Sequence, residues 1–411
     1  MSEIVRVAAR GEGVTADGRF APLAAPGDRL LADGTLEAGP HRQVPPCRHF
    51  PECGGCQLQH LDDIAWADFL RDRVVGALAA QGLETEVREA MLSPPRSRRR
   101  ASLQAERRGR QVLMGFSEAK SHRIVDMAEC WVLAPELLAL LQPLRMLLAG
   151  MLGRGRASVH LTLADQGVDV LIEGVEAEGL AAAEALTAFA ERHGLARLAL
   201  DGGLGPETRW EPRPVTVTLG GAGQGSDDAE HRWKAGGGGV AVGLPPAAFL
   251  QATSEGEAAL VTGVREAVGG AATVADLFAG LGTFAFALAP ARVYAAEADR
   301  AAILALKGAA GAAQRQVFAE HRDLYRRPLT TDELGRFEAA VIDPPRAGAR
   351  DQAAGLAAAA LGRLGYVSCN PSSFARDAKI LCEGGWRLEW VVPVGQFRWS
   401  THVELVAGFV R

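Results

Sequence analysis

The second half of the chain alternates short apolar runs with longer amphipathic segments. Four of the runs are typical of buried parallel strands, and they span 274–278, 292–296, 339–343 and 364–368. Helical segments separate them, and strands that alternate with helices favour a doubly wound parallel sheet of the α/β class. We expect this sheet to occupy residues 249–411.

The start of the chain has another pattern. Short apolar runs alternate with Gly, Pro and Asp turns up to about residue 45, which predicts a β module too small for a robust core. Apolar residues then recur at helical spacing, which predicts a helix over about 62–81. We therefore expect a small β module over 1–45.

The middle of the chain, 46–248, mixes the two patterns and predicts an α+β region. Strands are expected at 157–163 and 168–172, and Ala- and Leu-rich helices near 135–152 and 176–193. A Gly-rich tract from Leu219 to Gly239 breaks the periodicity, which predicts a hairpin tip or a flexible connection.

Length and composition narrow the class of protein. At roughly 150 residues per domain, 411 residues predict two to three domains. Hydrophobic residues make up 48% and charged residues 23%, so disordered, collagenous and disulfide-scaffold classes are disfavoured. No signal-peptide pattern and no long apolar run is present, so we expect a cytoplasmic protein without a membrane contact. In that reducing compartment, the six cysteines are better interpreted as metal ligands or reactive thiols.

Arginine supplies most of the positive charge of this mildly acidic chain. The net charge is -5, and only four of the 44 basic residues are lysines. A basic stripe of arginines lies within fifteen residues: Arg96, Arg98, Arg99, Arg100, Arg107, Arg108 and Arg110. Arginine binds phosphate in a bidentate manner and stacks on bases, so the stripe is either a contact for nucleic acid or a solvated face.

Acidic residues and glycines mark a ligand site at the strand ends. Gly280 and Gly282 stand where a strand passes into a helix, a turn at which backbone amides approach a ligand. Glu297, Asp323 and Asp343 follow the next three expected strands. Ligands of doubly wound sheets bind at this edge, and an acid such as Glu297 is placed to bind ribose hydroxyls. No third glycine follows, which favours a nucleoside without phosphates, such as S-adenosylmethionine, over a dinucleotide.

A reactive thiol is expected at the same edge. Asp343 and Arg346 flank two prolines after one strand, and Cys369 follows the next strand just before a helix. The helix N-terminus and Arg346 are expected to lower the pKa of the Cys369 thiol toward the reactive thiolate. Cys382, inside the following helical segment, is assigned to the core.

A terminal apolar segment carries one carboxylate, Glu404. If Glu404 faces the cavity of Cys369, burial raises its pKa and suits it to proton abstraction; the alternative is a surface strand residue. The nearby His402 is expected on the opposite face of the strand and is the weaker candidate.

Four other thiols form a candidate metal site. Cys47, Cys53 and Cys56 are close in sequence, 73 residues separate Cys56 from Cys130, and no histidine ligand is evident. This composition fits either zinc or an iron–sulfur cluster.

Taken together, these motifs resemble those of the bacterial RNA uracil-C5 methyltransferases, which use S-adenosylmethionine. The matching segments, from residue 47 to the C-terminus, are Cys-x5-Cys-Gly-Gly-Cys at 47–56, Phe249-Leu250-Gln251, Asp276 to Gly282, Asp343 to Arg346, Ser368 to Pro371 with Arg376-Asp377, and His402-Val403-Glu404. The resemblance implies a class I methyltransferase domain with a Rossmann-like sheet. It also implies structured RNA as the partner, with neither DNA nor a membrane, and we expect a monomer.

The resemblance implies roles for individual residues. Cys369 would add to C6 of uracil, and Glu404 would remove the C5 proton after methylation. Asp343 would contact the cofactor or the target base. The further positions that match cofactor binding are Gln251, Phe278, Gly280, Gly282, Thr283, Glu297 and Asp323.

Two features of the resemblance concern the target base and the cofactor contacts. Phe249 is either a stacking surface for the target base or a core residue. The chain also departs from the family pattern at Ala252-Thr253, where Val-Asn is usual, and at Thr283, where Asn is common. Thr283 still offers a hydrogen bond, so the exact contacts change rather than cofactor binding itself.

The cysteine spacing is similar to the [4Fe-4S] ligation of the 23S rRNA enzymes, which the tRNA enzymes generally lack, and zinc remains the alternative. Residues 1–45 resemble a shortened TRAM module, an RNA-binding β-barrel. We therefore expect methylation of one uridine, with 23S rRNA favoured over tRNA. The rivals are a non-catalytic RNA-binding assembly factor and an N-methyltransferase, which would leave Cys369 unexplained.

Overall fold

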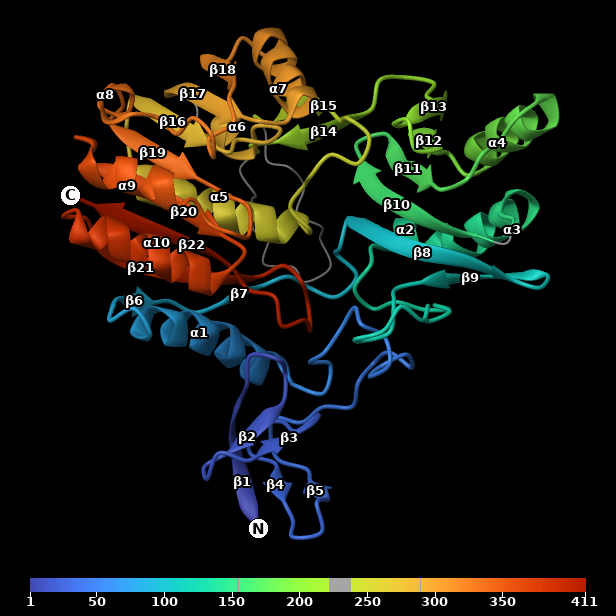
Figure 1. Cartoon of the computed structure of the whole chain (residues 1–411), viewed down its shortest axis with the longest axis horizontal. Helices are drawn as coiled ribbons and strands as arrows, with labels where there is room; N and C mark the ends of the chain where they lie inside the picture. The colour runs from blue at the N-terminus through green and yellow to red at the C-terminus, as the bar shows by residue number, and fades with distance from the viewer. Residues whose placement is uncertain (154, 222–237, 289) are drawn as a thin grey trace.

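The computed structural model describes residues 1–153, 155–221, 238–288 and 290–411. Most of the Gly-rich tract over 219–239 therefore lies outside the described residues. Three sheet-bearing parts are evident: a small N-terminal sheet, a central sheet and a large C-terminal sheet (Figure 1).

The large sheet of the second half has nine strands. Along the sheet they follow the order β18 (Val317–His321), β17 (Arg292–Glu297), β16 (Thr273–Leu277), β19 (Ala339–Ile342), β20 (Arg363–Ser368), β22 (Glu404–Val410), β21 (Arg387–Gly395) and β6 (Glu86–Val87), with β7 (Met91–Leu92) also on β21. The strands from β18 to β20 are parallel, and β22 runs antiparallel between β20 and β21. From β16 the chain runs outward through β17 to β18 and then returns to β19 on the other side of β16, so the predicted doubly wound sheet is confirmed.

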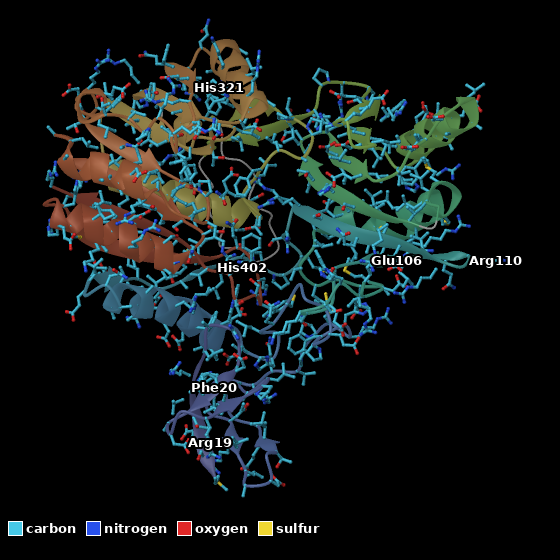
Figure 2. All side chains as sticks on the ribbon, in the orientation of Figure 1. Arg19, Phe20, Glu106, Arg110, His321 and His402 are labelled. Atoms are coloured by element: carbon cyan, nitrogen blue, oxygen red, sulfur yellow. The ribbon has the colours of Figure 1, made fainter. Side chains whose placement is uncertain are left out.

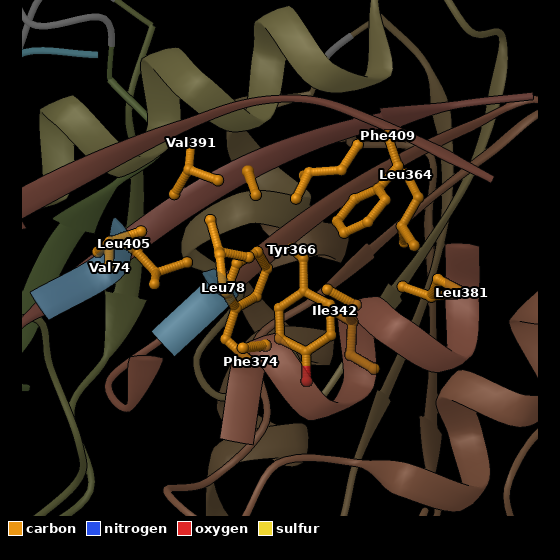
Figure 3. Close-up of a cluster of buried hydrophobic side chains, with 14 of the residues drawn as sticks. Val74, Leu78, Ile342, Leu364, Tyr366, Phe374, Leu381, Val391, Leu405 and Phe409 are labelled. Carbon is orange, nitrogen blue, oxygen red and sulfur yellow. The ribbon is translucent and has the colours of Figure 1, made fainter. Parts of the chain in front are cut away.

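Helices cover both faces of this sheet because its strands are apolar on both sides. One face packs on α5 (Ser254–Val268), α6 (Thr283–Ala287) and α7 (Arg300–Ala312). The other packs on α8 (Thr331–Leu334), α9 (Arg350–Ala358) and α10 (Pro371–Glu383). On this second face Tyr366, Phe374 and Phe409 pack together in a buried cluster (Figure 3).

The first half contributes to the large sheet as well. Helix α1 (Asp63–Ala79) begins at Asp62, whose carboxylate accepts a hydrogen bond from the amide of Ala65, and it packs against α10 and β21. The hairpin of β14 (Thr216–Leu219) and β15 (Val240–Gly243) packs on α6 and α7. The predicted domain boundary between 46–248 and 249–411 stays a prediction. Helix α1 and strands β14 and β15 precede this boundary in sequence, yet they pack against elements that follow it.

The central sheet lies beside the large one. Its order is β13 (Glu207–Trp210), β12 (Arg197–Asp201), β11 (Gly167–Glu173), β10 (Arg156–Ala164), β8 (Arg100–Arg108) and β9 (Gln111–Gly115). It packs against α2 (Pro135–Ala139), α3 (Leu141–Met151) and α4 (Leu180–Arg192). The helix expected near 135–152 is thus two helices, which meet at Leu140.

The N-terminal module is a five-stranded sheet of short strands in the order β3 (Phe20–Ala21), β2 (Gly13–Thr15), β1 (Ser2–Val7), β4 (Arg29–Leu30) and β5 (Leu36–Glu37). Its buried apolar core is small and includes Ile4, Ala21 and Ala24. The fully buried carboxylate of Asp28 adds to it by accepting hydrogen bonds from the amides of Ala25 and Gly39. No helix within the described residues has the length and apolar character needed to cross a membrane.

Candidate active site

A cavity of about 650 Å³ opens where the parallel strands of the large sheet end. Most of the residues expected at the site line it: Gln251, Phe278, Gly280, Thr283, Glu297, Asp323, Asp343, Cys369 and Glu404. Most of them converge because they follow or begin a strand at the same sheet edge, while Gln251 lies in the loop before α5 and Thr283 begins α6. Gly282 does not line the cavity. It begins α6 with a φ of 94°, and a Cβ there would lie 2.8 Å from the ring of Phe286, so glycine is required for packing.

Cys369 sits in the turn between β20 and α10, and two hydrogen bonds tie that turn to the Asp343–Arg346 loop. The side chain of Asn370, the N-cap of α10, donates to the carbonyl of Arg346 over 3.1 Å, and the hydroxyl of Ser373 donates to the same carbonyl over 3.1 Å. The two loops that carry the thiol and Arg346 are therefore held as one unit.

A fully buried carboxylate, Asp377, stabilises this unit through hydrogen bonds. It accepts hydrogen bonds from the hydroxyl of Tyr366 over 2.7 Å, from the amide of Ala349 over 2.7 Å, and from the guanidinium of Arg376. The Arg376-Asp377 pair of the sequence motif thus fixes the loop geometry and does not line the catalytic cavity.

The pKa of the Cys369 thiol is not lowered, so that prediction was wrong. Burial, together with the carboxylates of Glu404 and Asp343, raises the pKa of Cys369 to about 11, and Arg346 only partly opposes them. Burial and the acidic lining of the cavity together outweigh the guanidinium of Arg346. The thiol is therefore protonated in the free protein.

Glu404 opens β22, directly beside the end of β20, and its side chain is buried. Burial raises the pKa of its carboxyl to about 7, while Gln396, Arg100 and Arg346 act in the opposite direction. The expectation of a raised pKa is confirmed. A carboxylate with a pKa near neutrality is suited to accept a proton at physiological pH.

A buried glutamine, Gln396, connects Glu404 with the rest of the cavity. Its side-chain amide hydrogen-bonds Glu404 and donates to the side-chain oxygen of Gln251 over 2.8 Å. Its own side-chain oxygen accepts from the amide of Ala252 over 2.7 Å. Gln251 in turn lies 3.5 Å from a carboxylate oxygen of Asp343. Gln396 was not predicted, because it stands just after β21 in a segment that carries no motif of its own.

His402 also lines the cavity, which corrects the expectation that it faces away from Glu404. The strand begins only at Glu404, so the alternation of side chains along a strand does not apply to His402. Even within a strand, His402 and Glu404 would share a face, because they are two positions apart. Its ring lies 5.5 Å from that of Phe397, and burial lowers its pKa, with Arg346 and Arg98 adding to the effect. Figure 2 shows His402 between the large and the central sheet.

The other end of the cavity has the features of a nucleoside site. The carboxylate of Glu297 accepts hydrogen bonds from the amides of Gly280, over 2.9 Å, and Asp299, over 2.7 Å, so its orientation is set by the backbone. Phe278 adopts a φ of 63° and its ring packs 5.5 Å from that of Tyr325. An oriented carboxylate beside apolar and aromatic walls fits the ribose and base of a nucleoside cofactor.

The basic stripe divides into groups with different roles. Arg98 is partly buried and its guanidinium lies against the rings of Phe116 and Phe397, and Arg99 pairs with Glu257. Arg100 enters the cavity and lies 4.5 Å from the ring of Phe249. Arg110 instead stands at the far tip of the β8–β9 hairpin (Figure 2). The stripe is therefore not one phosphate-binding surface.

Phe249 is not a core residue. Its side chain is 61% exposed and lines the same cavity as Cys369 and Glu404, in contact with Arg100. A partly free aromatic face at the mouth of a cavity is suited to stacking on a base. Cys382, assigned to the core, is half-buried and packs against the cluster of Figure 3.

The four cysteines of the candidate metal site line one small cavity beside the central sheet. Cys47, Cys53 and Cys56 come from one loop and Cys130 from another. In the described part of the chain, however, no three His, Cys, Asp or Glu side chains are grouped closely enough to hold a metal ion. The four thiols therefore share a cavity but are not close enough in this structure to form a metal-binding group.

Known proteins resemble this chain over its whole length, although no protein-family model matches it. It is 50% identical over 414 residues to an uncharacterized RNA methyltransferase of Zymomonas mobilis, covering 100% of both chains. It is 32% identical over 430 residues to the 23S rRNA (uracil(1939)-C(5))-methyltransferase RlmD of Halomonas elongata, covering 96% of this chain and 86% of the relative.

A solved structure shares the fold. The crystal structure of Pyrococcus abyssi tRNA (uracil-54, C5)-methyltransferase in complex with S-adenosyl-L-homocysteine matches with a TM-score of 0.73 at 24% identity, covering 100% of this chain and 99% of that chain. This match supports a class I methyltransferase fold. With the full-length sequence relatives, it shows that this enzyme belongs to the family of S-adenosylmethionine-dependent RNA uracil-C5 methyltransferases.

Proposed function

We propose that this enzyme methylates C5 of one uridine in 23S rRNA, with Cys369 as nucleophile and Glu404 as base. The observation that carries the proposal is the meeting of a thiol and a carboxylate of raised pKa, from adjacent strand ends, in the same cavity as the nucleoside site. The relative RlmD bears the name of a 23S rRNA enzyme and supports the choice of RNA.

The chemistry requires the thiol because C5 of uracil is a weak nucleophile. The Cys369 thiol first releases its proton to water. The resulting thiolate forms a bond to C6, and the π electrons of the C5–C6 bond become an enolate that is nucleophilic at C5. S-adenosylmethionine supplies the electrophilic methyl group. The carboxylate of Glu404 then accepts the C5 proton, the C5–C6 double bond re-forms, and the Cys369 thiolate leaves.

Other residues of the cavity orient the two reactants. Glu297, held by backbone amides, binds the ribose hydroxyls of the cofactor, with Phe278 and Asp323 beside it. Gln251 and Asp343 bind polar groups of the cofactor or the uracil. Phe249, backed by Arg100, stacks on the flipped base, which costs a few kcal/mol to leave its stack.

Mapping of 5-methyluridine by mass spectrometry tests reaction and substrate together. RNA from cells with and without the gene is compared, and we expect one uridine of 23S rRNA to lose its methyl group in the deletion strain. Loss from tRNA instead would reassign the substrate. Unchanged 5-methyluridine in both RNAs would contradict the proposed function.

We further propose that Cys47, Cys53, Cys56 and Cys130 hold a [4Fe-4S] cluster. The support is a small shared cavity lined by four thiols, three from one loop and one from another. The cluster would join the loop of 47–56 to that of Cys130. Protein purified without oxygen should contain iron and sulfide in equal amounts. Stoichiometric zinc without a visible absorption band would overturn this proposal.

A further inference from the structure

A second large cavity, of about 700 Å³, lies outside the catalytic site on the outer edge of the large sheet. It is formed by β17, the edge strand β18 and the segment around α8, seen near the top of Figure 1. Its lining includes the starts of strands β16, β17 and β18, whereas the catalytic cavity is lined by residues at their ends. The two cavities share no lining residue, so the proposed reaction leaves this one unexplained.

The wall of this edge cavity is a platform of three aromatic rings. Phe318 on β18 is 68% exposed, although it is a large apolar side chain. Its ring is stacked on that of Tyr294, with centroids 6.1 Å apart and planes 19° from parallel. Tyr294 also contacts Phe337, at 5.6 Å between centroids. The ring of Phe318 is held on one face by Tyr294, so its other face is free to stack on a flat ligand.

The rim of the edge cavity is positively charged. Arg292, Arg315 and Arg336 line it, and within the described residues the guanidinium groups of Arg292 and Arg336 have no partner. The two acids of the lining are already engaged. Glu333 forms an ion pair with Arg322, and Glu320 accepts a hydrogen bond from the hydroxyl of Tyr294 over 2.6 Å. A local positive rim on a chain of net charge -5 attracts an anion.

We propose that the edge cavity binds an unpaired nucleotide of the RNA substrate, at a distance from the uridine that is methylated. The base stacks on Phe318, and the adjacent phosphates pair with Arg292 and Arg336. Stacking on an aromatic face tolerates any base, and arginine is the residue best suited to phosphate. The proposal rests on the RNA methyltransferase activity, and it assigns a second contact for a large RNA.

The test compares Phe318→Ala with Leu304→Ala, which removes another exposed apolar side chain, on α7. Full-length protein is titrated with transcribed 23S rRNA and with a short stem-loop that contains only the methylated uridine. For the long RNA we expect Phe318→Ala to weaken binding about 5- to 100-fold and to raise KM without a change in kcat. Binding of the stem-loop by Phe318→Ala, and of both RNAs by Leu304→Ala, should match wild type.

The arginines are tested by the salt dependence of binding. Arg292→Ala and Arg336→Ala should each lower the slope of log affinity against log salt for the long RNA by about one, while Lys307→Ala on α7 should leave it unchanged. Ultraviolet cross-linking followed by trypsin should attach a nucleotide to the peptide 316–322, which contains Phe318.

The outcomes separate this proposal from the proposed function. If long RNA is methylated with the same KM by Phe318→Ala and wild type, the edge site is wrong while the reaction stands. A cross-link of the peptide 316–322 to a protein, and none to RNA, would also overturn it. If neither protein methylates any RNA, the proposed function fails instead.

Discussion

The catalytic cavity and the cysteine cavity are both lined by cysteine, but they are built differently. In the first, Cys369 and Glu404 lie at neighbouring strand ends, and the sheet fixes their positions. In the second, Cys56 and Cys130 lie in separate loops without regular structure. Residues at strand ends need no added group to stay together, whereas loops gain from a bond that joins them. Changes in the first cavity should therefore affect chemistry, and changes in the second should affect stability.

Replacement of the nucleophile should have the largest effect. Cys369→Ala removes the sulfur that bonds to C6, so we expect methylation to fall by about a thousandfold or more. Tritium transfer from labelled cofactor to RNA measures it. Cys382→Ala, outside the cavity, is the matched control and should retain activity. A Cys369→Ala protein with substantial activity would exclude the covalent mechanism and leave the rival N-methyltransferase chemistry.

Replacement of the base should separate the two halves of the reaction. Glu404→Gln still allows attack and methyl transfer but removes the proton acceptor, so we expect turnover to fall about 100- to 10,000-fold. A covalent protein–RNA adduct should accumulate and be visible on a denaturing gel. Absence of the adduct with normal RNA binding would contradict the role of Glu404.

The pH dependence follows from the same carboxyl group. Glu404 has a pKa raised to about 7 and acts only when ionised, so the rate of methylation should fall as the pH decreases below about 7. Steady-state turnover rates between pH 5.5 and 9 measure this limb, because Glu404 acts after methyl transfer. A rate that stays constant down to pH 5.5 would show that another group accepts the proton.

Removal of a thiol from the cysteine cavity tests the other half of the comparison. Cys56→Ser should lose iron and lower the thermal midpoint by about 5 °C, because the link between the two loops is lost. Binding of S-adenosylhomocysteine, measured by calorimetry, should be unchanged. A variant that keeps its midpoint would show that no bonded group joins these loops.

The amide that contacts Glu404 should have a smaller effect. In Gln396→Leu the hydrogen bond that lowers the pKa of Glu404 is absent, so the acidic limb should move to higher pH and the rate at pH 7 should fall about fivefold. The rate should recover at pH 9, which a purely structural defect would not do. Gln352→Leu is the control, since Gln352 is equally buried but lies outside the cavity.

The strand-end residues of the site were predictable because parallel strands end at one edge. Glu297, Asp323, Asp343 and Cys369 each follow an apolar run, and the order of runs and helices implied that they converge. The basic stripe shows the opposite case. Arg98, Arg99 and Arg100 are adjacent in sequence, yet they contact three different surroundings because each side chain packs against a distant segment.

The amino-acid sequence by itself determined the alternation of strands and helices, the acids and thiol at the strand ends, and the membership of the family, since these depend on local pattern. Only the tertiary structure decided the protonation of Cys369, the contact between Gln396 and Glu404, and the place of α1 on the large sheet. The physical reason is that burial and charge act through space. The carboxylates that raise the pKa of Cys369 belong to other strand ends, and their distance from the thiol cannot be derived from the sequence around Cys369.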